Sequence, residues 1–226
     1  MSAFRPIRNA SHDPHLLVDD HAVVRTGYRR LLDAEPGLHV IGEAASANQA
    51  NAFVRRERPD VALVDLSLKG SSGLEAIRGM LARLPGLRIL ALSMHESRGH
   101  VTQAMRSGAH GYLTKHSEPA EVIEGIRRVA EGKRVLAPEI AHLLDQEVVD
   151  RESLMAALTP REFEVLRLRA HGDSTADIAS AMHLSPKTIL NYLSLIRQKL
   201  DADTDFKLLH LAVEYGLVET PSRSVE

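Results

Sequence analysis

The stretch VALVDLSLKGSSGLEAIRGMLARL, residues 61–84, opens with an apolar run that contains a single acidic residue. Residues 61–66 are apolar except for Asp65. A continuous apolar run of this length is typical of a strand buried on both faces of a sheet. Residues 73–84 then form an amphipathic stretch with the spacing of a helix. A buried strand followed by such a helix is the repeating unit of a parallel α/β sheet, so this stretch predicts that fold class.

The same unit recurs on both sides of this stretch. We expect five strands, at residues 15–18, 39–44, 61–66, 88–93 and 111–114. We expect five helices, at residues 22–34, 47–57, 73–84, 97–107 and 118–131. Five βα units predict a doubly wound (βα)5 domain over residues 14–134, with its site at the carboxyl ends of the strands. Pro14 is expected to shorten the first strand to about four residues.

A second domain, made only of helices, is predicted at residues 157–218. Thr159 and Glu162 have the spacing of a capping box and place a helix start at Pro160. A short helix at 175–182, a turn at 183–185 and a longer helix at 186–200 predict a helix-turn-helix, and a fourth helix follows at 204–215. The remaining segments are an N-terminal tail (1–13), a partly helical linker (135–156) and a C-terminal tail (219–226).

The composition excludes several classes of protein. The 226 residues include no cysteine, which rules out disulfides, thiolate catalysis and cysteine-ligated zinc. Hydrophobic residues make up 44% and charged residues 26%, the balance of a globular chain. No apolar run approaches the roughly 20 residues of a membrane span, and the first residues do not form a secretory signal. We therefore expect a cytoplasmic protein with no membrane partner.

The net charge of −2 is unevenly distributed. Residues 1–134 hold 19 basic and 15 acidic residues, whereas residues 155–215 hold 7 basic and 8 acidic ones. Any contact of the helical domain with nucleic acid must therefore rest on a few placed residues, because a broad basic face is absent from its sequence.

Polar side chains follow the expected strand ends. Asp19 and Asp20 come directly after the first strand, and Asp65 lies near the end of the third. Because these strands are neighbours in such a sheet, the carboxylates should share one pocket, and their repulsion favours a bound Mg²⁺. Ser93 closes the fourth strand and Lys115 follows the fifth. A hydroxyl, an ammonium and a divalent cation around one carboxylate are suited to stabilising a phosphoryl group on Asp65.

These motifs resemble the receiver domain of two-component response regulators. The matching segments are Leu16–His21, Val64–Gly70 with Gly73, Leu92–Ser93 and Gly111–Lys115. The resemblance implies that Asp65 accepts a phosphoryl group from a histidine kinase and that Lys115 contacts it. It further implies a Mg²⁺ site formed by Asp20, Asp65 and the backbone carbonyl of Ser67, with Asp19 in support, and a switch pair formed by Ser93 and Tyr112.

Two other residues bear on this resemblance. Lys69 stands where the family has proline and adds a positive charge near the pocket. Ser67 stands where a phosphatase of the haloacid dehalogenase type would carry a second aspartate. We therefore expect no enzyme beyond the phosphoryl chemistry of the receiver itself.

The helical domain resembles the LuxR-type helix-turn-helix of the NarL/FixJ class. The matching segments are Leu158–Glu162, Glu164–Leu166, Ile178–Ala179, Leu184–Ile189, Ile196 and Lys199–Leu200. Ser185–Thr188 with Tyr192, and Ala212–Val218, are similar to the GacA/UvrY branch of that class. The resemblance implies that the helix at 186–200 enters the major groove of promoter DNA and that the last helix pairs two copies into a homodimer.

The candidate DNA contacts all lie on the helix at 186–200. Leu190, Asn191 and Ser194 occupy the positions that read bases. The candidates for phosphate contacts are Lys187, Thr188, Arg197 and Lys199. Together with the first domain, these residues predict a phosphorylation-dependent transcriptional regulator.

Two alternatives remain open at this point. Leu190, Leu193 and Leu195 make the recognition helix unusually apolar; packing explains Leu193 best, but an apolar helix face also suits a protein partner. The first alternative is therefore a protein-binding regulator with weak or no DNA contact. The second is a regulator whose DNA binding does not depend on phosphorylation.

Overall fold

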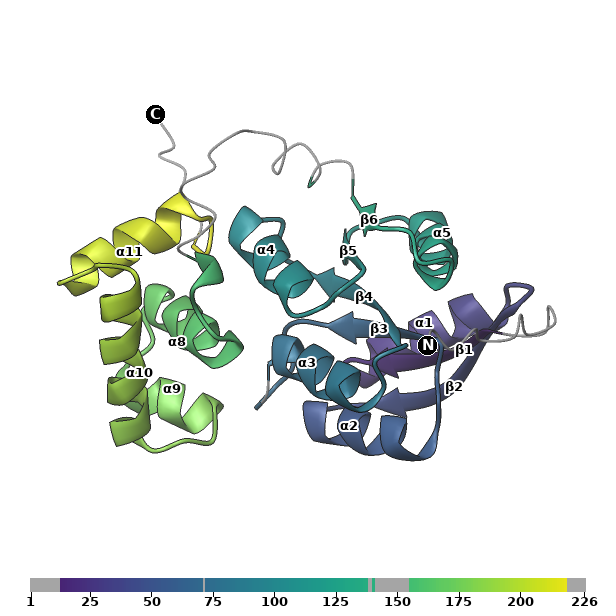
Figure 1. Ribbon diagram of the computed structural model, residues 1–226, viewed down its shortest axis with the longest axis horizontal. Helices are drawn as coiled ribbons and strands as arrows, with labels where there is room; N and C mark the ends of the chain where they lie inside the picture. Colours follow the sequence, from purple (N-terminus) through teal and green to yellow (C-terminus); the bar gives the residue numbers. More distant parts are fainter. Residues whose placement is uncertain (1–12, 71, 138–139, 141–154, 219–226) are drawn as a thin grey trace, which may run out of the picture.

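The computed structural model describes residues 13–70, 72–137, 140 and 155–218, and it places them in an α/β domain and a helical domain (Figure 1). The α/β domain is built on a six-stranded sheet in the order β2-β1-β3-β4-β5-β6, in which every pair is parallel. The strands are β1 (Asp13–Val18), β2 (Leu38–Ala44), β3 (Val61–Asp65), β4 (Arg88–Ser93), β5 (Gly111–Thr114) and β6 (Val135–Leu136). This confirms the predicted fold class and the five predicted strands.

Helices connect the strands at the predicted places. They are α1 (Ala22–Asp33), α2 (Ala47–Arg56), α3 (Gly73–Arg83), α4 (Arg98–Arg106) and α5 (Pro119–Ala130). All five residues of β3 are buried, and each helix turns buried residues toward the core, as the alternation of apolar and amphipathic stretches predicts.

The first strand corrects one expectation. Pro14 does not shorten β1 to about four residues, because β1 has six, Asp13–Val18. The Pro14 carbonyl accepts a hydrogen bond from the Asp60 backbone N–H (2.9 Å), so the residue loses only its donor. The pairing of β1 with β2 also shifts register between His15 and Leu16. Such an irregularity allows an inner strand to accommodate a proline.

The last strand was not expected. Val135 and Leu136, which the sequence analysis placed in the linker, pair with Gly111 and Tyr112 of β5. Two residues are too few to produce a detectable periodicity, but burial of Val135 holds them against the sheet. Most of the predicted linker, the N-terminal tail except Asp13, and the C-terminal tail lie outside the described residues.

The helical domain consists of α8 (Pro160–Ala170), α9 (Thr175–Ala181), α10 (Pro186–Lys199) and α11 (Asp205–Glu214). Thr159 and Glu162 form the predicted capping box at the start of α8. The turn between α9 and α10 places His183 in the left-handed region (φ 54°), which lets α10 begin three residues later. Among the described residues, no helix is long and apolar enough to cross a bilayer.

Candidate functional site

The carboxyl ends of β1, β3 and β5 bring two carboxylates and one ammonium together. Asp65 is the last residue of β3, and Asp19 directly follows β1, the neighbouring strand. Lys115 directly follows β5, and its Nζ lies 2.7 Å from Asp65 Oδ2 and 2.8 Å from Asp19 Oδ2. Asp19, Asp65 and Lys115, three of the side chains that the sequence placed at strand ends, therefore meet in one pocket.

The turn after β3 fixes the orientation of the Asp65 carboxylate. The Ser67 backbone N–H donates to Asp65 Oδ1 at 2.9 Å, while Oδ2 accepts from Lys115. Gly73 opens α3 directly against the strand end, because a Cβ at this position would lie 2.2 Å from the Asp65 carbonyl oxygen. Only glycine allows α3 to start so close to the carboxylate.

Burial and mutual hydrogen bonding set the protonation of Asp65 and Lys115. The Asp65 carboxyl is buried, and burial raises its pKa, although hydrogen bonds from Lys115 and the Ser67 N–H oppose the effect. Burial also acts to lower the pKa of Lys115, but its hydrogen bonds to Asp19 and Asp65 outweigh this and raise the pKa. Lys115 therefore stays charged at neutral pH, where it can neutralise negative charge that develops beside Asp65.

Asp20 makes the pocket suited to a divalent cation. Its carboxyl side chain is only 6% exposed, yet neither oxygen has a hydrogen-bond partner. Asp19, Asp20, His21 and Asp65 each offer a ligand atom, and these atoms lie within 4.8 Å of one another. A buried carboxylate that makes no hydrogen bond, beside two further carboxylates, fits Mg²⁺, which takes oxygen ligands.

The sequence reasoning missed His21. It is the last residue of the Leu16–His21 motif, and its place directly after two aspartates at a strand end is a signal for the same pocket. The role of the Ser67 carbonyl as a metal ligand stays a prediction.

The predicted switch pair lies next to the pocket. Ser93 and Tyr112 are both fully buried, at the end of β4 and in the adjacent strand β5. The Tyr112 hydroxyl donates to the His95 carbonyl oxygen (2.5 Å), and the His95 N–H donates to Ser93 Oγ (3.1 Å). Burial raises the pKa of the Tyr112 hydroxyl, so it remains a donor. Both members of the pair thus hold the same residue, His95, in the β4–α4 turn.

Some of the candidate DNA-contact residues are exposed to solvent, and others are hydrogen-bonded or ion-paired within the domain. Lys187, Asn191 and Ser194 are exposed on α10, and Leu190 is 57% exposed. Thr188 is partly covered and bonds to the N-cap residue, Ser185 (2.8 Å). Arg197 and Lys199, by contrast, are paired inside the domain.

Arg197 Nη2 lies 2.5 Å from Asp205 Oδ1, and Lys199 Nζ lies 2.6 Å from Glu162 Oε2. These two basic residues would have to leave or share their partners in order to hold DNA phosphates. Leu193 is buried, as the packing interpretation predicts. The assignment of all seven contacts stays a prediction.

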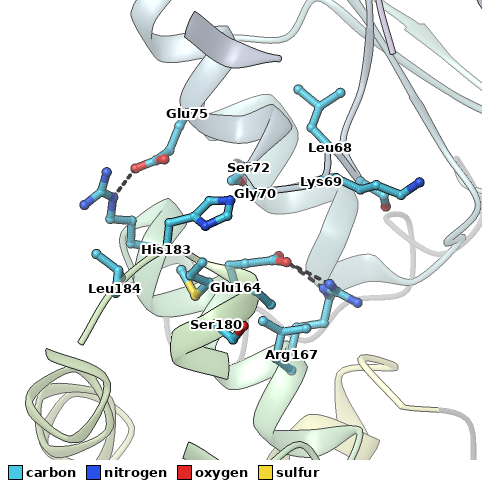
Figure 2. Close-up of a pocket in the computed structure, with 15 residues that line it drawn as sticks. Leu68, Lys69, Gly70, Ser72, Glu75, Glu164, Arg167, Ser180, His183 and Leu184 are labelled. Carbon is cyan, nitrogen blue, oxygen red and sulfur yellow. Dashed lines mark hydrogen bonds and ion pairs between the residues drawn. The ribbon is translucent and has the colours of Figure 1, made fainter. Parts of the chain in front are cut away.

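The two domains meet at α8, which lies beside α3 and α4, whereas α10 lies on the far side of α8 (Figure 1). Arg161 Nε of α8 pairs with Glu75 Oε1 of α3 at 2.5 Å, and Gln103 of α4 donates to the Met155 and Leu158 carbonyls. His183, from the turn of the helix-turn-helix, lies beside Gly70 (Figure 2). Both residues line a cavity of about 440 Å³ between the domains. This docking leaves the candidate reading face of α10 exposed.

Comparison with known proteins identifies both domains. Residues 16–127 match the family model described as "Response regulator receiver domain", and residues 156–212 match "Bacterial regulatory proteins, luxR family". The chain is 35% identical over 212 residues to the response regulator UvrY of Escherichia coli K12, which covers 92% of this chain and 97% of UvrY. It is 34% identical over 210 residues to the response regulator GacA of Pseudomonas aeruginosa, with coverage of 92% and 98%.

A solved structure with a similar fold is RcsB from Salmonella enterica serovar Typhimurium, bound to promoter rprA in the presence of phosphomimetic BeF3-. The TM-score is 0.64 at 24% identity, and the match covers 89% of this chain and 98% of RcsB.

Proposed function

Because this chain belongs to the response regulators that join a receiver domain to a LuxR-type helix-turn-helix domain, we propose that phosphorylation of Asp65 controls its binding to promoter DNA. The phosphoryl donor is a cognate histidine kinase. The chain acts as a regulator in the cytoplasm, where its DNA target is found, and it catalyses no reaction beyond transfer and loss of this phosphoryl group.

The observation that carries this proposal is the position of Lys115, 2.7 Å from Asp65 and 2.8 Å from Asp19. An Asp65 carboxylate oxygen attacks the phosphorus of phosphohistidine, the new O–P bond forms and the P–N bond breaks, and the imidazole leaves with a proton. The ammonium of Lys115 neutralises the oxygens of the transferred group. Asp20 and Asp65, with the Ser67 carbonyl, would hold Mg²⁺, which supplies further positive charge.

The exposed face of α10 supports DNA as the partner. Asn191 has the side chain that pairs with adenine, Leu190 can contact a thymine methyl, and Lys187 can hold a phosphate. Since this face is exposed in the described docking, phosphorylation need not uncover it. We propose instead that phosphorylation favours a homodimer, in which two copies of α10 read two half-sites.

Helix α11 supports the dimer. Phe206 is 80% exposed and Leu209 is 43% exposed, and both are large apolar side chains. Two such residues on one short helix suit a contact with a second copy. The expectation that α11 pairs the domains on DNA fits this exposure.

The switch is tested with Asp65→Asn, in the last residue of β3, and a matched variant, Asp60→Asn, in the residue directly before the same strand. Incubation with ³²P-labelled acetyl phosphate and Mg²⁺ should label the unaltered protein and Asp60→Asn equally. Asp65→Asn should incorporate no label, because its amide is not a nucleophile. Equal labelling of Asp65→Asn would place the phosphoryl group elsewhere and contradict the proposal.

A protein-binding regulator is the second candidate. Leu190 and Leu195 are both large, apolar and substantially exposed on α10, and an exposed apolar pair of this kind also suits a protein partner. Replacing Leu190 with serine should abolish a protein contact, whereas replacing Asn191 with alanine should weaken DNA binding and relax base preference at one position.

A further inference from the structure

His21 directs its side chain toward the acidic pocket and not toward the helix that it caps. It is the N-cap residue of α1 and has extended backbone angles (φ −84°, ψ 107°), but its side chain makes no capping hydrogen bond. Its Nδ1 is hydrogen-bonded to Asp19 Oδ1 at 3.2 Å and lies 3.2 Å from Asp20 Oδ1. The backbone N–H of the same residue donates to Asp19 Oδ1 at 2.7 Å, which fixes the backbone of His21 beside the carboxylates.

These separations match the ligands of one octahedral ion. With bonds of about 2.1 Å, neighbouring ligands lie about 3.0 Å apart and opposite ligands about 4.2 Å apart. The two 3.2 Å separations of Nδ1 correspond to neighbouring positions. The donor atoms of Asp19, Asp20, His21 and Asp65 all fall within 4.8 Å of one another, so a small contraction would close them around a single ion.

Asp20 shows independently that the pocket is built to receive a ligand. Both of its carboxylate oxygens are buried without a hydrogen bond; the nearest cationic or ring nitrogens are His21 Nδ1, 3.2 Å from Oδ1, and the Lys69 ammonium, 3.6 Å from Oδ2. His21 is 51% exposed, so its ring connects the buried Asp20 carboxylate, 3.2 Å away, with solvent. An ion that enters from solvent would meet the imidazole nitrogen and the Asp20 oxygens together.

We propose that His21 is a metal ligand in this pocket and gives it a mixed nitrogen and oxygen donor set. An imidazole nitrogen adds little for Mg²⁺, which prefers oxygen, but it favours the later first-row divalent metals. The site would therefore take a transition metal such as Ni²⁺ or Zn²⁺ more tightly than a pocket of carboxylates alone. This inference rests on the proposed function, because it concerns the cation site beside Asp65.

Pulsed EPR of Mn²⁺ bound to the full-length protein tests the nitrogen directly. The unaltered protein should show modulation of the electron spin echo by a ¹⁴N nucleus, and the pattern should change when the protein is labelled with [¹⁵N]histidine. His21→Gln, which keeps an oxygen donor of similar reach, should bind Mn²⁺ without this modulation. His39→Gln, at a distant exposed histidine, should retain it.

A displacement titration in the same samples tests selectivity. Release of Mn²⁺ by Ni²⁺ should require about tenfold more Ni²⁺ in His21→Gln than in the unaltered protein, since loss of a ligand should weaken binding at least as much as loss of a residue that supports one. Release by Mg²⁺ should change by less than about twofold, because an oxygen-preferring ion gains little from the imidazole.

The outcomes separate this inference from the proposed function. Mn²⁺ binding that requires Asp20, as tested with Asp20→Asn, but shows no ¹⁴N modulation would overturn the His21 ligand and leave the cation site intact. Absence of any Asp20-dependent Mn²⁺ binding would overturn both the His21 ligand and the cation site beside Asp65. Thermal melts of His21→Gln establish that the variant is folded, so that loss of the ¹⁴N modulation reports loss of the His21 ligand and not unfolding.

Discussion

Lys69 brings a second ammonium group to the edge of the acidic pocket. Its Nζ lies 3.6 Å from Asp20 Oδ2, but its side chain is 80% exposed, so it can move away. A cation that binds at Asp20 must do so against this positive charge. The lysine therefore acts on cation affinity and not on the carboxylates' positions.

We expect Lys69→Gln to raise the affinity for Mg²⁺. At separations near 4 Å, charges interact by about 1 kcal/mol even in water, so removing one should tighten binding about threefold to tenfold at low salt. The gain should shrink as salt screens the charge. Calorimetric titration against Lys69→Arg, which keeps the charge, measures the effect; equal affinities of the two variants would refute it.

Much of the pocket could be predicted from the sequence because strand-end position alone specifies it. Asp19, Asp65 and Lys115 each directly follow or end an apolar run, and parallel strands bring such positions to one edge. His21 follows the same rule, yet its orientation depends on the N-cap backbone angles and could not be predicted. The engagement of Arg197 by Asp205 is likewise a property of how α10 and α11 pack.

Among the elements, α3 begins in close contact with the backbone of Asp65, the residue proposed to be phosphorylated. We expect Gly73→Ala to destabilise the receiver domain by about 1–3 kcal/mol, because the added Cβ would collide with backbone atoms of Asp65 and Leu66 that cannot rotate away. Gly27→Ala is the matched control in α1, where nothing lies within 4 Å of the added atom.

Gly27→Ala should stabilise the protein by about 0.5–1 kcal/mol, since alanine favours a helix. Urea denaturation measures both variants, and acetyl phosphate labelling should fall only in Gly73→Ala. A neutral or stabilising Gly73→Ala would contradict the close approach of α3 to Asp65.

Helix α4 carries a buried histidine at the contact between the domains. His100 stacks on His95, with ring centroids 4.3 Å apart, and meets the edge of Phe163 of α8 at 5.2 Å. Its Nδ1 is bonded to Ser97 Oγ, but Nε2 has no hydrogen-bond partner. Burial, and then the nearby His95, Arg167 and His171, hold the pKa of His100 well below its usual value.

This shift predicts a loss of stability in acid. Because the pKa of His100 is lower in the folded than in the unfolded state, the unfolded chain takes up a proton first as the pH falls below about 6.5. The free energy of unfolding should then fall by at most about 1.4 kcal/mol per pH unit from this group. Denaturation at pH 7, 6 and 5 should show a weaker pH dependence in His100→Gln than in His210→Gln, an exposed control; identical slopes would rule this out.

The ends of the strands and helices could be predicted to within a residue or two wherever the segment was long enough to show a hydrophobic periodicity. The predicted capping box at Thr159 and Glu162 is present, for example, because a cap depends on residues close in sequence. Strand β6 and the full length of β1 depend on pairing with distant strands instead. Local sequence carries little of that information.

For the whole molecule, the distribution of charge and the docking of the domains point to the same mode of action. The helical domain holds 7 basic and 8 acidic residues over 155–215, so one copy should bind DNA weakly. The reading face of α10 is exposed in the described docking, and α11 exposes Phe206. The proposed control of DNA binding through dimerisation is consistent with both features. A dimer strengthens a weak DNA contact by making it twice, and the face of α10 that makes the contact does not have to be uncovered first.

The docking of the domains could not be predicted from the sequence. Arg161 and Glu75 are ordinary surface residues in their own helices, and only the packing of α8 beside α3 brings them together. An exposed pair of this kind contributes about 0–1 kcal/mol, so the docking is not held by it alone.

Selection of bound fragments from a genomic DNA library is the most direct test of phosphorylation-controlled DNA binding. The full-length protein and Asp65→Asn would each be tested at low and moderate salt, with and without acetyl phosphate. We predict that the phosphodonor strengthens binding of the unaltered protein to fragments with two half-sites about one helical turn apart, or a multiple of it, and leaves Asp65→Asn unchanged. Equal binding by both proteins in every condition, or no selected sequence at either salt, would contradict the account.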